Sequence, residues 1–270
     1  MTELVFLKLG GSLITDKDKP YTPRLDKLAE LAREIASSRT PNQHLVLGHG
    51  SGSFGHAAAK QYGTREGIKD SPRKSEDQNY WKGFAEVWFQ ASQLNRFVME
   101  SLRGAGLPAI ALAPISAVSS REMGVTSWDL TPLRSALDAG LLPVIYGDVI
   151  FDEARGGTIL STGDLFAHLA RQLKPKRILL AGLEAGVWED FPASTRLVAG
   201  ISLQSYEAMR DGIGASASVD VTGGMAAKVG QMFDLIREVP GLTAQIFSAE
   251  ETGNLSRALA GERVGTELRA

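Results

Sequence analysis

The chain contains no cysteine, which excludes disulfide bridges and thiolate metal sites. It has four histidines, and they are too scattered along the sequence to suggest a zinc site. We therefore expect no dedicated protein metal centre.

A strong charge of either sign is also missing, because 29 Lys and Arg residues oppose 31 Asp and Glu residues for a net charge of −2. No long basic run is present, so we expect no nucleic acid partner. No apolar stretch reaches the roughly 18 residues of a membrane span. The N-terminus enters a predicted strand without a signal-like segment, and we expect a cytoplasmic protein with no membrane partner.

The residues that are present are typical of a globular enzyme, with 43% hydrophobic and 22% charged residues over 270 positions. Short apolar runs such as 5–7 and 45–47 predict buried strands, and they alternate with segments of helical periodicity such as 24–38. This alternation indicates an α/β fold with a mostly parallel sheet covered on both faces. No linker or repeat divides the chain, so we predict a single domain over residues 1–270.

Three segments depart from the alternation. Residues 149–162 are predicted to form a hairpin around Gly156-Gly157, and the weak alternation of 115–128 allows another. Residues 63–79 are polar and rich in turn formers, which predicts a loop.

Residues 45–56 read LVLGHGSGSFGH, an apolar run followed by four glycines among small polar residues. Because glycine lacks Cβ and tolerates positive φ, several backbone N–H groups can converge there on an anion such as a phosphate. Taken alone, the stretch is equally consistent with a tight turn between a strand and a helix that begins at Ala57.

Two further clusters favour the phosphate interpretation. Residues 5–15, VFLKLGGSLIT, place Lys8 at the end of an apolar run with two glycines after it, although neither the Walker pattern nor GxGxxG is present. Residues 220–228, DVTGGMAAK, place Lys228 four residues beyond Gly224, about one turn into a helix that begins at the turn. Three anion-binding elements suggest a nucleoside triphosphate.

Residues 80–102 carry apolar side chains at helical spacing, with Trp81, Phe84 and Trp88 among them. This aromatic crowding has two interpretations. The side chains pack in the core or at a dimer contact, or they form an apolar wall for a substrate.

Together these motifs resemble the amino acid kinase superfamily and, within it, the isopentenyl phosphate branch. The resembling segments are KLGGSLIT at 8–15, HGSGSFGH at 49–56, PIS at 114–116, TPL at 131–133, DAGLLPVIYGDV at 138–149, TGD at 162–164, DVTGGM with Lys228, and VGT at 264–266. The resemblance implies an αβα sandwich around an eight-stranded, mostly parallel sheet. It also implies an acceptor site in the N-terminal half, an ATP site in the C-terminal half, and a homodimer.

The activity that the resemblance implies is transfer of the γ-phosphoryl group of ATP, with Mg²⁺, to isopentenyl phosphate. Phosphoryl transfer needs alignment and positive charge that follows the migrating group. We expect Lys8, Lys17 and Lys228 to supply that charge. Asp164 is expected either to orient these lysines or to lie near the metal.

The resemblance also assigns binding residues, position by position. For ATP they are Lys8, Gly10, Gly11, Ser12, Gly52, Gly182, Gly186, Gly223, Gly224 and Lys228. For the substrate they are Gly50, Ser51, Gly55, His56, Gly163, Trp81, Phe84, Trp88 and Ile150.

His56 has the most specific predicted role. An acceptor that is already a phosphate monoester needs a neutralising partner rather than a base, and an imidazole donor four residues after Gly52 would hold its terminal oxygen. His49 ends a predicted strand and is expected to be structural. His44 and His168 belong to no motif and are expected to be surface or packing residues.

Three positions depart from the family pattern. Ser51 stands where a glycine is usual and adds a hydroxyl beside the acceptor phosphate. Segment 181–188 reads AGLEAGVW rather than a sequence like TDVDGVY, so base specificity is left open. Ala227 stands where some relatives have a second lysine.

Two alternatives stay open. A related kinase could act on another alkyl phosphate or on a phosphonate such as fosfomycin, although apolar residues at 81, 84, 88 and 150 favour a short prenyl tail. The chain could also be a non-catalytic ligand-sensing module on the same fold. The joint presence of Lys8, Lys228, Asp164 and His56 argues against that.

Overall fold

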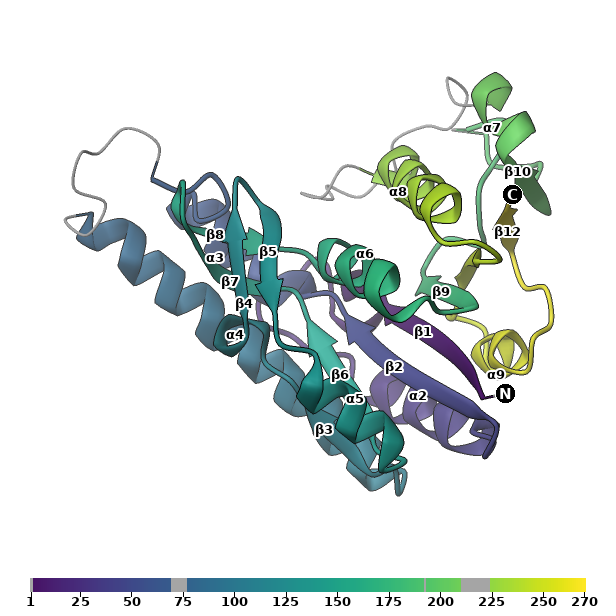
Figure 1. Ribbon diagram of the computed structural model, residues 1–270, viewed down its shortest axis with the longest axis horizontal. Coiled ribbons are helices and arrows are strands. Elements are labelled where there is room, and N and C mark those ends of the chain that lie inside the picture. Colours follow the sequence, from purple (N-terminus) through teal and green to yellow (C-terminus); the bar gives the residue numbers. More distant parts are fainter. Residues whose placement is uncertain (1, 69–76, 192, 210–223) are drawn as a thin grey trace.

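The main sheet has eight strands in the order β10-β12-β11-β9-β1-β2-β6-β3 (Figure 1). The computed structural model describes residues 2–68, 77–191, 193–209 and 224–270. In sheet order the strands are Gly200–Ser202, Thr266–Arg269, Thr243–Ser248, Arg177–Gly182, Glu3–Leu9, Gln43–His49, Leu142–Tyr146 and Ala109–Ala111. Every neighbouring pair is parallel except β11 with β12. The predicted mostly parallel sheet is confirmed.

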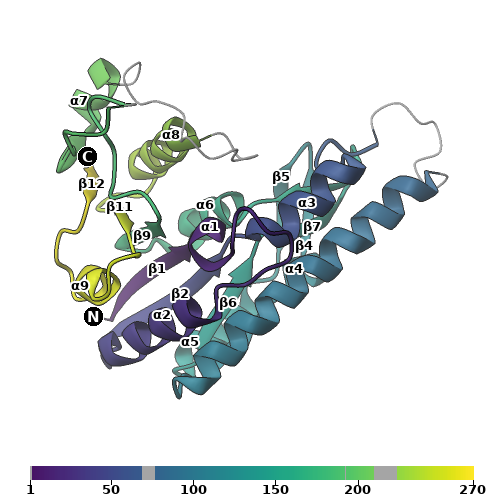
Figure 2. The same ribbon diagram turned by 180° about the vertical axis from the view of Figure 1, so that it is seen from behind.

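Helices cover both faces of this sheet. One face, toward the viewer in Figure 1, carries α5 (Thr131–Asp138), α6 (Thr162–Leu173) and α8 (Gly224–Glu238). The other face, seen in Figure 2, carries α2 (Leu25–Ser38), α4 (Gln78–Gly104) and α9 (Asn254–Leu259). The short α7 (Leu203–Met209) follows β10 directly.

Alternating side chains of the central strands supply a separate core to each face. Phe6 of β1 packs in the cluster that includes α6 and α8, whereas Val5 and Leu7 pack in the cluster that includes α2 and α4. Successive side chains of a strand point to opposite faces, so a run buried on both sides must be continuously apolar. This requirement is why VFL at 5–7 and LVL at 45–47 were recognisable as strands.

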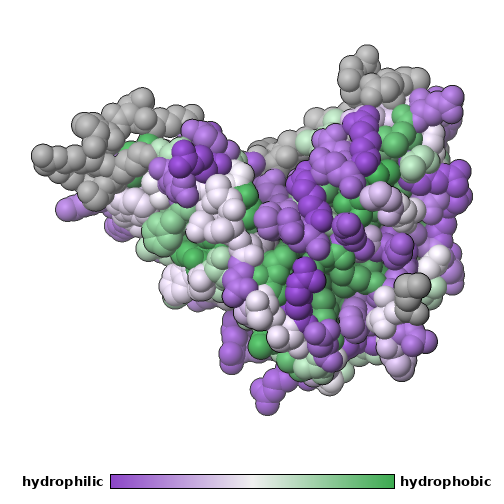
Figure 3. All heavy atoms as spheres, viewed as in Figure 1, coloured by the Kyte–Doolittle hydropathy of each residue, from purple (hydrophilic) through white to green (hydrophobic). Residues whose placement is uncertain are grey.

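The apolar core reaches the surface on the α6 side. Apolar side chains show at the centre of this face, with hydrophilic side chains around its margin (Figure 3). Leu173 and Leu180 are among the partly buried residues that pack against the core cluster of α6 and α8. In the part of the chain that the structure describes, no helix is long and apolar enough to cross a membrane.

A second, four-stranded sheet has the order β5-β4-β7-β8. Its strands are Gly124–Trp128, Val118–Arg121, Asp148–Asp152 and Gly156–Leu160. The predicted hairpin in 149–162 is confirmed as β7 and β8, but its turn lies at residues 153–155, and Gly156 and Gly157 are the first residues of β8. The segment 115–128 forms the other hairpin. That the two hairpins join through β4 and β7 was not predicted, because their pairing is non-local.

The carboxylate of Asp152 holds the turns of both hairpins. It is 2% exposed and accepts hydrogen bonds from the Ser120 hydroxyl at 2.9 Å, the Met123 N–H at 3.0 Å and the Arg155 N–H at 2.9 Å. Burial alone would raise the pKa of Asp152, but these hydrogen bonds outweigh burial and the pKa lies below its ordinary value. The carboxylate therefore stabilises the positive φ angles of Glu122 and Met123, 51° and 65°, at the β4–β5 turn.

The helix after β2 begins earlier than the sequence indicated. We expected it to begin at Ala57, whereas α3 runs from Gly52 to Tyr62. Five residues of the glycine-rich stretch, 52–56, are therefore helical, and His56 lies in the second turn of α3. Helix propensity disfavours glycine there, so tertiary contacts must hold this first turn.

Candidate active site

A cavity of about 980 Å³ opens where the glycine-rich turns follow β1 and β2. The carboxyl ends of parallel strands lie at one edge of a sheet, and the turns after β1, β2 and β9 meet there. Twelve of the predicted site residues line this cavity: Lys8, Gly10, Gly11, Ser12, Lys17, Gly50, Ser51, Gly52, Gly55, His56, Gly182 and Lys228. The structure thus brings together residues that are up to 220 positions apart in the sequence.

The two N-terminal glycine turns are in backbone contact with each other. A Cβ atom on Gly11 would lie 2.4 Å from the Gly52 nitrogen, and one on Gly50 would lie 2.8 Å from the Gly11 nitrogen. Side chains at these positions would force the turns apart. The glycines are therefore required for close approach between segments as well as for the approach of a phosphate to the backbone.

One face of α3 forms the cavity wall beyond the turns. His56 lines the cavity, and so does Lys60 one helical turn further on. The sequence reasoning missed Lys60, although its spacing of four residues from His56 on a helix was a usable signal. Gly55, just before His56, leaves room for the hydroxyl of Ser51, since a Cβ on Gly55 would lie 2.2 Å from Ser51 Oγ.

Cationic side chains outnumber acidic ones around the cavity. Among the described residues, Lys8, Lys17, Lys60, Arg65 and Lys228 line it, against the carboxylates of Asp18, Glu66 and Glu184. Lys17 is exposed on the loop between α1 (Gly11–Ile14) and α2, while Lys8 is half-buried at the end of β1. This balance suits polyanionic ligands such as nucleotides and phosphate esters.

The N-terminus of α6 lies close to Lys8. A Cβ on Gly163 would be 3.6 Å from Lys8 Nζ and 2.8 Å from Oε1 of Gln231, a residue of α8. Gly163 itself is not among the described residues that line the cavity. Its lack of a side chain nevertheless allows β1, α6 and α8 to meet at this point.

Asp164 forms a capping box with Ser161 at the start of α6. Its Oδ2 accepts hydrogen bonds from the Ser161 N–H at 2.8 Å and the Ser161 hydroxyl at 2.7 Å, and the Asp164 N–H donates to Ser161 Oγ at 3.2 Å. The carboxylate therefore has a clear structural role in starting the helix. Asp164 is not among the described residues that line the cavity. Its part in catalysis stays a prediction.

The residues predicted to form an apolar wall, Trp81, Phe84, Trp88 and Ile150, are not among the described residues that line the cavity. Phe84 is 5% exposed and packs with Tyr80, Trp81 and Phe151 beside the second sheet. Ile150 is fully buried in the core, and Trp88 is 42% exposed. Among the described residues, the apolar side chains on this part of the cavity are instead Ala59, Val87 and Ile159.

The sequence left both interpretations of these aromatic residues open because the apolar face of α4 is wide. The aromatic residues and Val87 follow the same helical periodicity, and periodicity does not show which of them faces the core, the solvent or a cavity. Val87 contacts the cavity because α4 packs against both α3 and β7 at this level.

Of the predicted ATP-binding glycines in the C-terminal half, some line the cavity and others do not. Gly182 lines the cavity at the end of β9. Gly186 packs against β12, since a Cβ there would lie 2.5 Å from Thr266 Oγ1. Gly186 is not among the described residues that line the cavity. Gly224 begins α8, four residues before Lys228, as expected. The prediction for Gly223 lies outside the described residues.

His49 is a structural residue, as expected. It is fully buried, and its ring nitrogens lie 3.1 Å from the Gly50 carbonyl oxygen and 3.2 Å from Asn95 Oδ1. The ring stacks on Tyr146 with centroids 5.4 Å apart. Burial lowers the pKa of His49, so the neutral form is favoured.

Asp148 is a buried carboxyl group next to Gly147, which lines the cavity. Its Oδ1 accepts a hydrogen bond from the Val149 N–H at 2.8 Å, whereas its Oδ2 has no partner among the described residues. Burial raises the pKa of Asp148 to about 7 despite hydrogen bonds from the Val149 and Ile115 N–H groups. A substantial part of the population therefore carries a neutral acid here at neutral pH.

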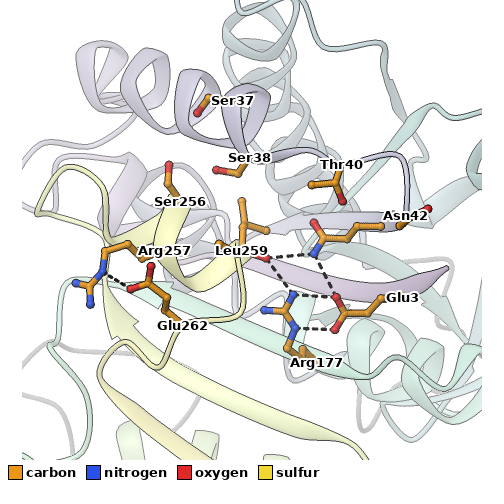
Figure 4. A pocket seen from close by; sticks show the side chains of 12 residues that line it. Glu3, Ser37, Ser38, Thr40, Asn42, Arg177, Ser256, Arg257, Leu259 and Glu262 are labelled. Carbon is orange, nitrogen blue, oxygen red and sulfur yellow. Dashed lines mark hydrogen bonds and ion pairs between the residues drawn. The ribbon is translucent and has the colours of Figure 1, made fainter. Parts of the chain in front are cut away.

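A second hollow lies at the opposite ends of the strands, where β1, β2 and β9 begin (Figure 4). Arg177 donates to both carboxylate oxygens of Glu3, at 2.8 and 3.0 Å, and to the carbonyl oxygen of Leu259 at 3.0 Å. The hydrogen bond from Arg177 holds the pKa of Glu3 below its ordinary value. These groups satisfy one another and join the sheet to α9, so we assign them a structural role.

The chain belongs to the amino acid kinase family, whose model matches residues 3–248. It is 32% identical to isopentenyl phosphate kinase from Methanocaldococcus jannaschii and 36% identical to isopentenyl phosphate kinase from Haloferax volcanii. Each alignment covers 98% of this chain and 98% of the relative. An X-ray structure of isopentenyl phosphate kinase superposes with a TM-score of 0.82 at 30% identity, covering 98% of this chain and 99% of that one.

The raised pKa of Asp148 leads to a testable prediction about stability. The folded-state pKa is about 7 and the ordinary value 3.8, so the folded state binds more protons between these pH values. The stabilising contribution of the neutral acid is complete below about pH 4 and is lost as the pH rises through about 7. Asp148→Asn mimics the neutral acid, so its free energy of unfolding relative to wild type should increase with pH across this window.

The slope should reach at most about 1.4 kcal/mol per pH unit. Urea unfolding at several pH values measures it, with Asp138→Asn, a change at an exposed position of α5, as the matched control. A constant difference between Asp148→Asn and wild type from pH 4 to 8 would contradict the prediction.

Proposed function

We propose that the protein transfers the γ-phosphoryl group of ATP to isopentenyl phosphate and forms isopentenyl diphosphate. The observation that carries this proposal is a single cavity lined by Lys8, Lys228 and His56 together with two glycine turns. Membership of the amino acid kinase family and full-length similarity to isopentenyl phosphate kinases support it. The described elements then form one kinase domain, with the acceptor in its N-terminal half and ATP in its C-terminal half.

On the acceptor side, the N-terminal turn of α3 and the His56 imidazole face one cavity. Backbone N–H groups and the helix dipole favour a phosphate at such a helix end. His56 holds the terminal oxygen of the acceptor phosphate and offsets its charge as the second phosphoryl group approaches. The acceptor oxygen is already an anion, so no base is required to remove a proton from it.

On the donor side, Lys8 and Lys228 reach the same cavity from β1 and α8. Gly10, Gly11 and Ser12 bring backbone close to the transferred phosphoryl group, and Gly182 leaves space at the end of β9, where a Cβ would meet no described atom within 4 Å. Lys17 lies on an exposed loop and adds charge when that loop closes. In this arrangement the cations follow the phosphoryl group from donor to acceptor.

The acceptor tail lies against Ala59, Val87 and Ile159. These side chains are apolar and offer no partner for the amino and carboxyl groups of an amino acid acceptor. A short prenyl chain fits such a wall better than a polar phosphonate does. This observation favours isopentenyl phosphate over the other acceptors considered.

Mg²⁺ accompanies the nucleotide in this proposal. The described residues contain no group of three or more His, Asp or Glu side chains that could hold a metal ion. Mg²⁺ commonly keeps several waters and binds through substrate phosphates with one or two carboxylates, and Asp18 and Glu184 are cavity carboxylates of that kind. When bound, the ion neutralises charge on the phosphate oxygens.

We also propose that two copies of the chain form a homodimer through α4 and the edge strand β3. Trp88 and Phe89 on α4 are 42% and 47% exposed, and Ile110 on β3 is 40% exposed. Exposed large apolar side chains on α4 and the position of β3 at the edge of the described sheet favour association with another surface of the same kind.

The function is tested with a coupled assay for ADP in the presence of isopentenyl phosphate. We expect turnover that stops on chelation of Mg²⁺. His56→Ala should lower kcat by roughly tenfold or more with the KM for ATP nearly unchanged, because the lost contact is to the acceptor. His44→Gln, at the start of β2, is the control.

No turnover of any alkyl phosphate by the wild-type protein would leave the ligand-sensing alternative in place. A collapse of ATP binding in His56→Ala would show that His56 belongs to the nucleotide side instead.

Tail length is tested at Val87. Val87→Ala removes two methyl groups from the cavity wall, so alkyl phosphates that are longer by one prenyl unit should gain roughly tenfold in kcat/KM over wild type. Val98→Ala makes the same change on the same helix at a buried position away from the cavity. Equal chain-length profiles for the two variants would mean that the tail lies elsewhere.

The proposed dimer is tested by light scattering after size exclusion. The wild-type protein should elute with twice the mass of one chain, and replacing Trp88 and Phe89 together with Glu should shift it toward the monomer. Replacement of the exposed Phe191 with Glu serves as the control, since Phe191 lies on neither α4 nor β3. A monomeric wild type at micromolar concentration would contradict the proposal.

A further inference from the structure

The hydroxyl of Thr15 joins the two glycine turns that meet at the cavity. Thr15 follows α1 directly and is 1% exposed. Its Oγ1 donates a hydrogen bond to the Gly11 carbonyl oxygen at 2.8 Å and accepts one from the Ser53 N–H at 3.0 Å. One buried oxygen thus bonds to the turn after β1 and to the first turn of α3.

This contact replaces the ordinary N-cap of α3. Ser51 occupies the N-cap position with φ −79° and ψ −13°, in the helical region rather than the extended region that an N-cap side chain uses. The Ser51 side chain makes no capping hydrogen bond within the described part of the chain. The Ser53 N–H, one of the first-turn donors that a helix cannot satisfy internally, is satisfied instead by a residue 38 positions away.

Steric contacts at the same point leave little freedom between the turns. Gly52 has φ +49°, and a Cβ there would lie 2.2 Å from Thr15 Oγ1 and 2.7 Å from the Gly11 carbonyl oxygen. The backbones are therefore as close as they can be, and the direction of the Thr15 hydroxyl decides how one turn is placed along the other.

Each turn carries a residue of the proposed chemistry. Lys8 precedes Gly11 by three positions on a strand, and His56 follows Gly52 by four positions on a helix. Both connections are rigid, so a displacement between the turns would displace Lys8 relative to His56. In-line transfer needs the reacting atoms roughly 3–3.5 Å apart and aligned.

We propose that Thr15 is a positioning residue whose hydroxyl sets the distance between the donor and acceptor phosphates by fixing the α3 N-terminus against the turn after β1. Thr15 touches neither substrate in this account. It acts through Gly11 and Ser53, and the inference rests on the proposed kinase function.

The test compares Thr15→Val, which keeps the shape and removes both hydrogen bonds, with Thr15→Ser, which keeps the hydroxyl. Thr15→Val should lower kcat roughly tenfold to 100-fold with little change in either KM, because binding of each substrate is retained while alignment is lost. Thr15→Ser should stay within roughly threefold of wild type.

Thr266 offers a matched control for stability. It is fully buried, donates to the Val198 carbonyl oxygen at 2.6 Å and accepts from the Val187 N–H at 2.8 Å. Thr266→Val therefore loses the same two kinds of hydrogen bond, and Thr266 is not among the described residues of the cavity wall. It should lower the melting temperature about as much as Thr15→Val without the loss in kcat.

A measurement independent of activity separates this inference from the proposed function. Hydrogen exchange at the Ser53 amide should accelerate in Thr15→Val and not in Thr266→Val, whether or not the wild type turns over isopentenyl phosphate. If Thr15→Val does not fold, Thr15→Ala and Thr15→Ser, which differ by one oxygen atom, carry the same comparison.

Unchanged exchange at Ser53, an equal loss of kcat in Thr15→Val and Thr266→Val, or an equal loss in Thr15→Ser would each overturn the positioning role. Absence of turnover in the wild type, with altered exchange in Thr15→Val, would instead count against the proposed function alone.

Discussion

Direct backbone contact between two glycine turns is the constraint on which the rest of this structure depends. The turn after β1 and the first turn of α3 approach so closely that a methyl group on Gly11 or Gly52 would overlap backbone or buried atoms. β1 and β2 are parallel neighbours, so their carboxyl ends already lie side by side. Because the glycines in both turns have no Cβ atom, the two backbones lie against each other and form one surface.

The surrounding elements act on this contact from three sides. α6 approaches Lys8 at Gly163, α8 brings Lys228 and Gln231, and the second sheet packs with α3 and α4 around Phe84 and Val87. α8 contributes positive charge through Lys228, and the second sheet with α3 and α4 contributes an apolar wall. A cavity with a cationic side and an apolar side suits an amphipathic acceptor, which is a property of short prenyl phosphates.

Much of the architecture could be predicted because each central strand is buried on both faces. Two cores are filled by consecutive apolar residues of β1, namely Val5, Phe6 and Leu7. Such a run can be recognised in the sequence alone. The four-stranded sheet was harder to predict from the sequence, because its β4–β7 pairing joins segments that no local pattern connects. The pairing also depends on Asp152, which accepts hydrogen bonds from the turns of both hairpins. The start of α3 was misplaced because the Ser53 N–H is capped by the distant Thr15.

The sequence by itself determined which residues have the chemistry for phosphate binding: Lys8, Lys228, His56 and the glycines around them, since charge and the absence of Cβ are properties of residue type. Only the tertiary structure decided which apolar residues line the cavity. Val87 does so and its neighbour Trp88 is exposed to solvent, because the packing of α4 against α3 and β7 sets the rotation of the helix. Helical periodicity gives the relative directions of side chains along one helix, but the direction of the cavity comes from the elements packed against it.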